Sequence, residues 1–409
     1  MYNPSIAANV RRLSVCLIVI CQIAAMALWF SASAAVPSLL DAEQISVNAA
    51  AALTSAVQLG FVAGTLTSAL FGLADRFDSR TIFSAAAVLG AMLNGALLAY
   101  GLDHPTAPVL RFATGVCMAG IYPVGMKLAA GWAAGNMGLL MGSLVGAVTL
   151  GSAMPHLFYA FASVSWQVPV SLASGCALIA AISIHFVQLG PKHAKSTTFH
   201  WSDLKSLLHN KPILLAQGGY LGHMWELYAM WAWLGSFLVW ALPASGMQVE
   251  LGQSSISLIT FLVMAAGALG CLLAGLLADR FGRTLTTIGA LLLSGGCALL
   301  IGFSVELGPT VVLVIAAIWG MTVVADSAQF SAATAELADP RLIGTVLTIQ
   351  TSLGFLLTAG SIWFIGQAAE LVGWRYAFIV LAIGPLLGAL SMLTLRRQPE
   401  ATKMAGGRR

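Results

Sequence analysis

Charged side chains are scarce in this chain of 409 residues: 8% are Asp, Glu, Lys or Arg, whereas 59% are hydrophobic. A soluble globular domain carries about 25% charged residues, so the composition excludes one. The apolar runs do not alternate with polar residues, which excludes a membrane-spanning β-barrel. The chain also lacks the Gly-x-x-x-x-Gly-Lys-[Ser/Thr] loop of an ATP-driven pump and the His-Glu-x-x-His motif of a zinc hydrolase. We therefore expect no enzyme, no cofactor and no bound metal.

Cysteines are few, and their spacing is not that of metal ligands or of a disulfide framework. All of them fall within long apolar runs: Cys16, Cys21, Cys117, Cys176, Cys271 and Cys297. The simplest interpretation is that they are thiols packed among apolar side chains.

Long apolar runs make up most of the chain. A run of about 20 apolar residues crosses a lipid bilayer as a helix, because the backbone must satisfy its own hydrogen bonds in lipid. The sequence predicts twelve such helices, at 13–36, 49–73, 81–100, 107–131, 138–161, 166–189, 212–241, 254–277, 284–303, 310–334, 342–365 and 373–395. The seventh is longer than a span requires, so we expect it to be tilted or broken. The first is too long for a cleavable signal peptide.

The placement of Lys and Arg predicts the orientation of these spans. If both ends lie in the cytoplasm, the outer loops carry only Arg375, Arg111 lies inside a span, and all other Lys and Arg residues lie on the inside. This bias explains the net charge of +4, and nucleic-acid binding is not needed to explain it. We predict an integral protein of a bacterial inner membrane, in contact with the lipid bilayer and monomeric.

The chain contains an internal repeat. Ala74-Asp75-Arg76-Phe77 recurs 204 residues later as Ala278-Asp279-Arg280-Phe281, and Ala25-Met26-x-x-Trp29 recurs at the same offset as Ala229-Met230-x-x-Trp233. This predicts two homologous six-helix bundles, at 1–189 and 212–409, joined by a basic linker at 190–211. Within the linker we expect a short amphipathic helix at 201–209 that tethers the bundles or binds a partner.

The same offset relates the most polar positions inside the spans. Gln22 corresponds to Glu226, and Tyr122 corresponds to Asp326. Equivalent polar positions in two related bundles would face a shared central cavity, and this is what we expect of all four.

Residues 275–283 read Gly-Leu-Leu-Ala-Asp-Arg-Phe-Gly-Arg. They match the cytoplasmic loop signature Gly-x-x-x-Asp-Arg-x-Gly-Arg, and with the twelve spans and the repeat the chain resembles the major facilitator superfamily. The corresponding loop of the first half is a weaker copy, with Phe71 in place of Gly and Asp78-Ser79 in place of Gly-Arg.

The resemblance implies a secondary transporter of all-α fold that works by alternating access, with these loops gating the cytoplasmic side. The gating candidates are Asp75, Arg76, Arg80, Gly275, Asp279, Arg280, Gly282 and Arg283. An acid near a helix end can pair with arginines in such a latch. The alternative is that these charges only set the topology.

Arg111 begins an Arg-x-x-x-Gly motif that ends at Gly115, similar to the fourth-helix motif of the superfamily. The resemblance links this arginine with proton coupling. Its position near the outer end of the span also allows it to snorkel to the interface. The fifth span lacks the Gly-Pro pair of the superfamily's drug antiporters, which weakens that assignment.

Two carboxyl groups lie well inside spans, at Glu226 and Asp326. Acids in such positions are costly and often form proton relays. His223 precedes Glu226 by three residues on the same helix face, so we predict a proton-handling pair. The alternative is that one acid pairs with Arg111 or Lys127.

Other polar and aromatic side chains in the spans are candidates for substrate contacts. The predicted cavity residues are Gln22, Trp29, Gln58, Tyr122, Lys127, Trp233 and Gln329. Aromatic faces suit an organic solute or a cation. Lys127 lies near the inner end of its span and could either attract an anion to the cavity floor or snorkel to the cytoplasm.

The leading hypothesis is a proton-coupled secondary transporter of a small organic solute that is zwitterionic or weakly charged. The second and eighth spans contain no arginine, which argues against the paired-arginine anion clamp of the superfamily's nitrate porters. Efflux of hydrophobic or drug-like compounds, and a sensor that binds without transporting, remain the alternatives.

Overall fold

The computed structural model describes residues 4–132, 137–161, 165–191, 210–247, 251–339 and 342–409. Within these ranges every regular element is a helix. The amphipathic helix expected at 201–209 lies outside the described residues, as does most of the linker.

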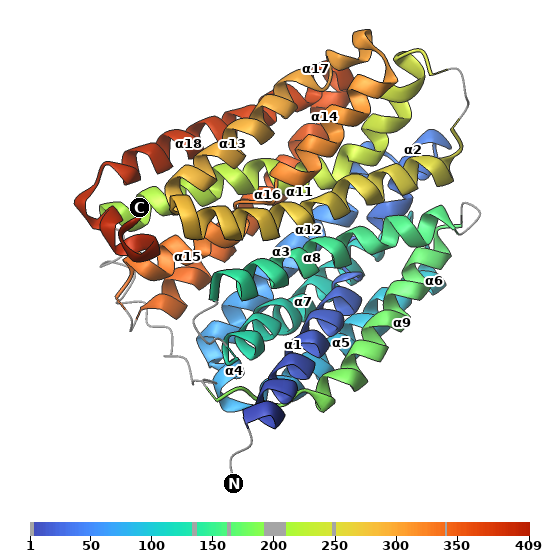
Figure 1. Ribbon diagram of the computed structural model, residues 1–409. Coiled ribbons are helices and arrows are strands. Elements are labelled where there is room, and N and C mark those ends of the chain that lie inside the picture. Colours follow the sequence, from blue (N-terminus) through green and yellow to red (C-terminus); the bar gives the residue numbers. More distant parts are fainter. Residues whose placement is uncertain (1–3, 133–136, 162–164, 192–209, 248–250, 340–341) are drawn as a thin grey trace.

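The first half is built from helices that alternate in direction across the bundle (Figure 1). Its elements are α1 (Pro4–Met26), η1 (Ser33–Ala35), α2 (Val36–Asp41), α3 (Val47–Phe71), α4 (Leu73–Arg76), α5 (Ser79–Gly95), α6 (Leu97–Tyr100), α7 (Ala107–Ala130), α8 (Met137–Ala160), α9 (Gln167–Ser183) and η2 (Ile184–Phe186).

The second half follows the same plan. Its elements are α11 (Lys211–Ala244), α12 (Gln253–Phe281), α13 (Arg283–Leu300), η3 (Ser304–Leu307), α14 (Pro309–Thr322), α15 (Ser327–Leu337), α16 (Ile343–Val372), α17 (Trp374–Ala377), η4 (Phe378–Ala382), α18 (Ile383–Arg396) and η5 (Pro399–Gly407). Twelve helical segments in the described ranges are long and apolar enough to cross a membrane, and each overlaps a predicted span. The prediction of twelve membrane helices is confirmed.

Two spans are interrupted where the sequence predicted continuous helices. The first span ends its α-helix at Met26 and resumes only at η1, and the tenth is broken at residues 323–326 between α14 and α15. Neither interruption contains Pro or Gly, the usual local causes of a break. The seventh span, by contrast, is one continuous helix of 34 residues, α11, so it is not broken.

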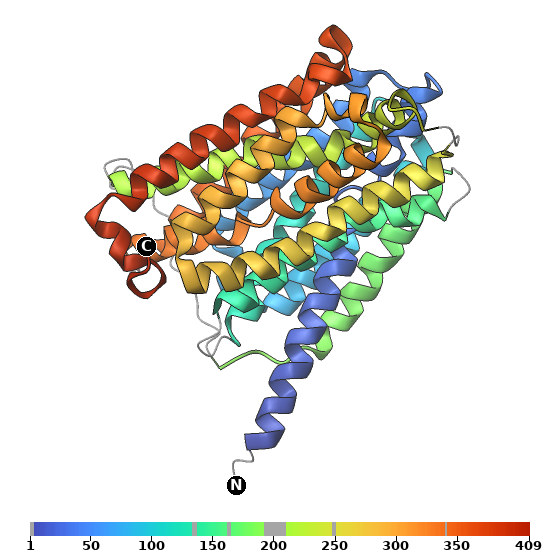
Figure 2. The same cartoon turned by 45° about the horizontal axis from the view of Figure 1, so that its top comes forward.

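The two halves lie side by side, with α8 packed along α12 and α3 packed along α16 (Figures 1 and 2). Small residues allow the close approach, since a Cβ added at Gly142 of α8 would lie 3.2 Å from the carbonyl oxygen of Cys271 in α12. Membrane helices use small residues at such contacts.

Both chain ends lie at the same end of the molecule as α4 and α15, which we call the terminal face (Figure 1). The other end carries α2, α6 and α17, and we call it the distal face. Large apolar side chains on the outside of the bundle are exposed, for example Leu269, Leu292 and Leu386. An apolar exterior over a core with buried polar groups is the pattern expected for a protein surrounded by lipid.

Candidate functional site

The break in the tenth span places a carboxyl group inside the second half. Asp326 is the last residue before α15, and its Oδ1 lies 2.8 Å from Nδ1 of His223 on α11. Both residues are 1% exposed, and Nε2 of His223 has no hydrogen-bond partner. One ring nitrogen of the histidine therefore lies at ion-pair distance from an acid, and the other has no hydrogen-bond partner among the described residues.

Glu226 has different partners from the ones predicted. Its carboxylate accepts a hydrogen bond of 2.7 Å from Nε1 of Trp319 and one of 2.8 Å from Oγ of Ser294. His223 and Glu226 share a side of α11, but they lie about 60° apart around the helix, and His223 contacts Asp326 at the α14–α15 break whereas Glu226 contacts Ser294 of α13 and Trp319 of α14. The structure thus pairs His223 with Asp326, and Glu226 binds neutral donors.

The repeat-related positions Gln22 and Glu226 lie inside their own halves. Gln22 packs on α7 and α5, since a Cβ added at Gly125 would be 2.0 Å from its Oε1 and 3.8 Å from Phe83. Glu226 is enclosed by helices of the second half. The neighbours described for Gln22 and Glu226 thus belong to their own bundles, and a contact of either side chain with a shared central cavity stays a prediction.

Arg111 is fully buried, with 0% exposure, so it does not snorkel to a membrane surface. Its guanidinium donates to the carbonyl oxygens of Leu28 (2.9 Å) and Trp29 at the break in the first span. It also donates to Oγ of Ser31 (3.0 Å) and Oδ1 of Asn94 (2.9 Å). Carbonyls left without helix partners need donors, and Arg111 supplies them, which explains how the chain unwinds there without Pro or Gly.

An aromatic cluster fills the contact between the halves near mid-span. We call it the interface cluster, and it consists of Trp29, Phe30, Phe61, Tyr228, Trp231 and Phe355. Phe61 of α3 and Phe355 of α16 have ring centroids 4.5 Å apart, and Trp29 lies 5.8 Å from Tyr228 of α11. Tyr122 of α7 extends the cluster, 6.2 Å from Phe61. Trp29 and Tyr122 therefore lie at the contact between the halves, and their contact with a substrate stays a prediction.

Trp233 lies outside this cluster. Its indole donates to the carbonyl oxygen of Ile362 (2.8 Å), and its ring is 6.0 Å from that of Trp374. The aromatic residues of α11 that meet the first half are instead Tyr228 and Trp231, whose rings lie 6.3 Å and 5.9 Å from that of Phe30. The internal repeat predicted Trp233 as a cavity residue. In the structure its side chain contacts α16 and α17.

The three glutamines predicted for the cavity have different surroundings. Gln58 of α3 is fully buried, and neither its side-chain nitrogen nor its oxygen has a partner; the same holds for Gln22. Gln329 of α15 accepts a hydrogen bond of 2.7 Å from Arg283, so it belongs to the loop network rather than to the interface cluster. Lys127 lies half-buried in the last turn of α7, on the terminal side of Tyr122.

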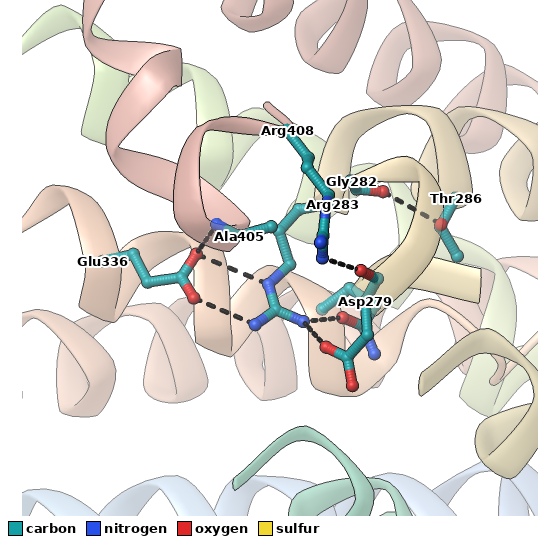
Figure 3. A network of polar contacts seen from close by, with 8 residues as sticks. Asp279, Gly282, Arg283, Thr286, Glu336, Ala405 and Arg408 are labelled. Atoms are coloured by element: carbon teal, nitrogen blue, oxygen red, sulfur yellow. Dashed lines mark hydrogen bonds and ion pairs between the residues drawn. The ribbon is translucent and has the colours of Figure 1, made fainter. Parts of the chain in front are cut away.

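The signature loop of the second half forms a polar network at the terminal face (Figure 3). Arg283 is its centre, with contacts to Asp279 at 3.7 Å and to Glu336 of α15 at 2.9 Å. The C-terminal segment joins it, because Glu336 accepts from the backbone N–H of Ala405 (3.0 Å) and Arg408 donates to the carbonyl of Asp279. This segment was not predicted to take part.

Glycine is required at position 282. Its φ of +92° lies in the left-handed region that favours glycine, and an added Cβ would lie 2.1 Å from the carbonyl oxygen of Arg409. Gly275 is buried within α12, and Arg280 is exposed at its end with its guanidinium over the Phe281 ring.

The corresponding loop of the first half makes its contacts within that half. Arg80 forms an ion pair of 2.7 Å with Asp78 and donates to the carbonyl of Val187 (3.2 Å). Arg76 is exposed at the end of α4, and the side chain of Asp75 lies outside the described part of the chain. In this conformation the polar contacts described for both loops stay within their own bundles.

Comparison with known proteins identifies the family. A family model described as Major Facilitator Superfamily matches residues 18–362 and again residues 232–408. The chain belongs to the Major Facilitator Superfamily. As a member, it is an integral membrane protein and a transporter of small solutes, which confirms the resemblance found in the sequence.

Relatives and solved structures agree with this assignment. The hexuronate transporter of Escherichia coli (strain K12) is 23% identical over 403 residues, or 91% of each chain. The uncharacterized MFS-type transporter YfnC of Bacillus subtilis (strain 168) is 29% identical over 161 residues, which span 39% of this chain and only 37% of that protein. A bacterial homolog of the human lysosomal transporter Spinster, in an inward-facing and occupied conformation, superimposes with a TM-score of 0.71 at 13% identity and covers 95% of this chain and 97% of that one. A mutant of the nucleoside transporter NupG gives the same score and identity over 94% and 99%. The structural likenesses show a shared fold.

Proposed function

We propose that this protein is a proton-coupled secondary transporter that moves a small organic solute by alternating access of its two bundles. The observation that carries the proposal is the buried pair of His223 and Asp326 at the break of the tenth span. A buried acid and imidazole in contact can exchange a proton without forming an isolated charge. His223 of this pair lies five residues before Tyr228 on α11, so a proton and a solute would occupy neighbouring sites.

The contact between the bundles supports a rocking motion. Inter-half hydrogen bonds include Asp41 with Gln253 and Asn48 with Gln367, both at the distal face. The signature loops at the terminal face pair within their own bundles. We infer that the terminal face is the cytoplasmic one and that loop contacts between the bundles form when it closes.

The test uses the reconstituted full-length chain and labelled hexoses, hexuronates and nucleosides. Asp326→Asn removes the proton-binding carboxyl group but keeps its size, so we expect accumulation driven by a pH gradient to be lost while exchange of solute across the membrane persists. Glu370→Gln, an exposed acid at the distal end of α16, is the control and should retain both. Full pH-driven accumulation in Asp326→Asn would refute the coupling role.

Efflux of hydrophobic compounds is the second candidate, and the interface cluster favours it because six aromatic rings offer a large apolar contact surface. Binding of uncharged dyes at the cluster, with no exchange of polar solutes, would support that function over the first.

A further inference from the structure

We propose that the interface cluster and the buried amide of Gln58 bind an uncharged ring-shaped solute rich in hydrogen-bond acceptors, of the hexose or nucleoside class. The site would discriminate against the same ring carrying a carboxylate or an ammonium group. This inference rests on the proposed transport function and narrows its substrate.

The interface cluster and the neighbouring Gln58 contain hydrogen-bond donors that have no partner within the described ranges. The indole nitrogens of Trp29 and Trp231 and both polar atoms of the Gln58 side chain have no hydrogen-bond partner, although each residue is at most 1% exposed. A buried donor without an acceptor is costly, and few persist in a folded protein. Two indole N–H groups and the amide N–H of Gln58 therefore have no acceptor in the described part of the protein. A solute with hydroxyl or carbonyl oxygens would supply these acceptors.

The donors come from both halves, on residues that lie at the contact between them. Gln58 lies between Ser55, which donates to the carbonyl of Ala359 at 3.2 Å, and Phe61, whose ring is 4.5 Å from Phe355. All three residues share one side of α3, so Gln58 faces α16. Trp231 belongs to α11, and its ring is 5.4 Å from that of Tyr228. A solute that bonds to Gln58 and Trp231 would join the two halves.

The charge of the surroundings disfavours an anion. Aromatic rings present negative faces, and burying a carboxylate without a cation is costly. Arg111 already donates to Leu28, Ser31 and Asn94. Arg283 donates to Glu336 at the terminal face. Both arginines are thus engaged by the protein itself, and Lys127 lies five residues beyond Tyr122 toward the terminal face, in the last turn of α7.

A cationic solute is disfavoured for a different reason. An ammonium group only donates hydrogen bonds, so wherever it faced an indole or amide N–H it would leave that group unpartnered. Neutral hydroxyls can both accept from these groups and donate to the amide oxygen of Gln58. The apolar face of a sugar or nucleobase would then lie against the rings.

Four solutes test the proposed preference for a neutral ring. Glucose, glucuronate and glucosamine share a pyranose ring and differ in charge. Uridine tests whether a nucleoside binds. Binding to the purified full-length protein is measured by tryptophan fluorescence and by competition. We expect glucose or uridine to bind at least about tenfold more tightly than either charged sugar. Equal or tighter binding of glucuronate or glucosamine, or no binding of either neutral solute, would overturn the proposal.

Two substitutions test the donors. Gln58→Leu and Trp231→Phe should each weaken binding of the neutral solute at least about fivefold, since Trp231→Phe removes one hydrogen bond and Gln58→Leu removes one or two. Gln58→Leu should also raise the melting temperature of the empty protein, because an unpartnered amide is removed. The control is Trp363→Phe, a tryptophan of α16 that is 52% exposed on the outside of the bundle. Affinities within twofold of the unmodified protein in both variants would contradict the assignment.

The same panel in proteoliposomes separates this inference from the transport function. Preferential exchange of glucuronate would overturn the substrate class and leave transport standing. Binding of a neutral solute without exchange would overturn transport and leave the substrate class standing.

Discussion

Arg111 shows how one side chain can replace the usual causes of a helix break. It is a fully buried cation whose acceptors are carbonyl, hydroxyl and amide oxygens. Because the carbonyls of Leu28 and Trp29 are satisfied by its guanidinium, the first span can unwind and carry Trp29 into the interface cluster. Arg111 is therefore a positioning residue for an aromatic group between the halves.

Arg111→Lys should lower the free energy of unfolding of the protein. Lys keeps the charge but lacks the planar fork that reaches several acceptors at once, so part of the buried network loses its donors. We expect a loss of about 3 kcal/mol in the free energy of unfolding, measured by thermal unfolding in detergent. Arg375→Lys is the control, because Arg375 and Glu306 form an exposed pair and exposed pairs contribute about 1 kcal/mol or less. Equal losses in the two variants would contradict this role.

At this scale the sequence indicates which residues matter better than it indicates their partners. Glu226, Asp326, His223 and Arg111 stand out because polar groups are rare inside spans, and all four are buried. Their pairing depends on the rotation of each helix and on the break at residues 323–326. That break contains neither Pro nor Gly, so the local sequence does not predict it. Ser294 and Trp319 donate to Glu226. Both lie in apolar runs with no motif around them, so the sequence does not predict them as its partners.

At the scale of elements, α3 and α7 approach closely enough to exclude any side chain between them. A Cβ added at Gly60 of α3 would lie 1.9 Å from the carbonyl oxygen of Phe112, and one added at Gly115 of α7 would lie 2.2 Å from that of Val57. The glycine of the Arg-x-x-x-Gly motif thus has a packing role. The sequence predicted both helices and their bounds to within two residues but could not predict which glycines face a neighbour.

Gly60→Ala should therefore destabilise the first half by about 2 to 3 kcal/mol, since the backbones must move apart. The matched control is Gly175→Ala in α9, where nothing lies within 4 Å of the added Cβ. That change should leave stability unchanged or raise it by up to about 1 kcal/mol, because Ala favours the helix. The two melting temperatures, measured in the same detergent, should move in opposite directions, and a shared direction would count against the packing argument.

The C-terminal segment depends on Glu336 for its attachment. Ala401 and Met404 of η5 are fully buried, and Glu336 bonds to both Arg283 and the N–H of Ala405. In Glu336→Ala the segment should detach more often, and trypsin should cleave after Lys403 at least about fivefold faster, in keeping with the loss of a charged hydrogen bond. Glu400→Gln, an exposed acid of η5, should cleave at the original rate. Unchanged cleavage in Glu336→Ala would show that the segment is held by its apolar contacts alone.

At the scale of the whole molecule, the internal repeat is expressed as two bundles that meet along α8 with α12 and α3 with α16. The sequence predicted the bundles because the lipid environment sets span length and apolar composition, and the internal repeat indicates two related halves. It could not predict which residues of the bundles meet. Sequence periodicity gives a side of a helix but does not say which neighbour that side contacts.

The most direct test of the rocking account is a reversible crosslink at the distal face. Asn48 and Gln367 are joined by a hydrogen bond of 3.0 Å between α3 and α16, so cysteines at both positions can be bridged by a short thiol-specific linker. We predict that the bridged Asn48→Cys, Gln367→Cys protein loses solute exchange in proteoliposomes and regains it when the linker is cleaved, whereas each single variant treated alike keeps its activity. Undiminished exchange in a fully bridged protein would contradict alternating access of the two bundles.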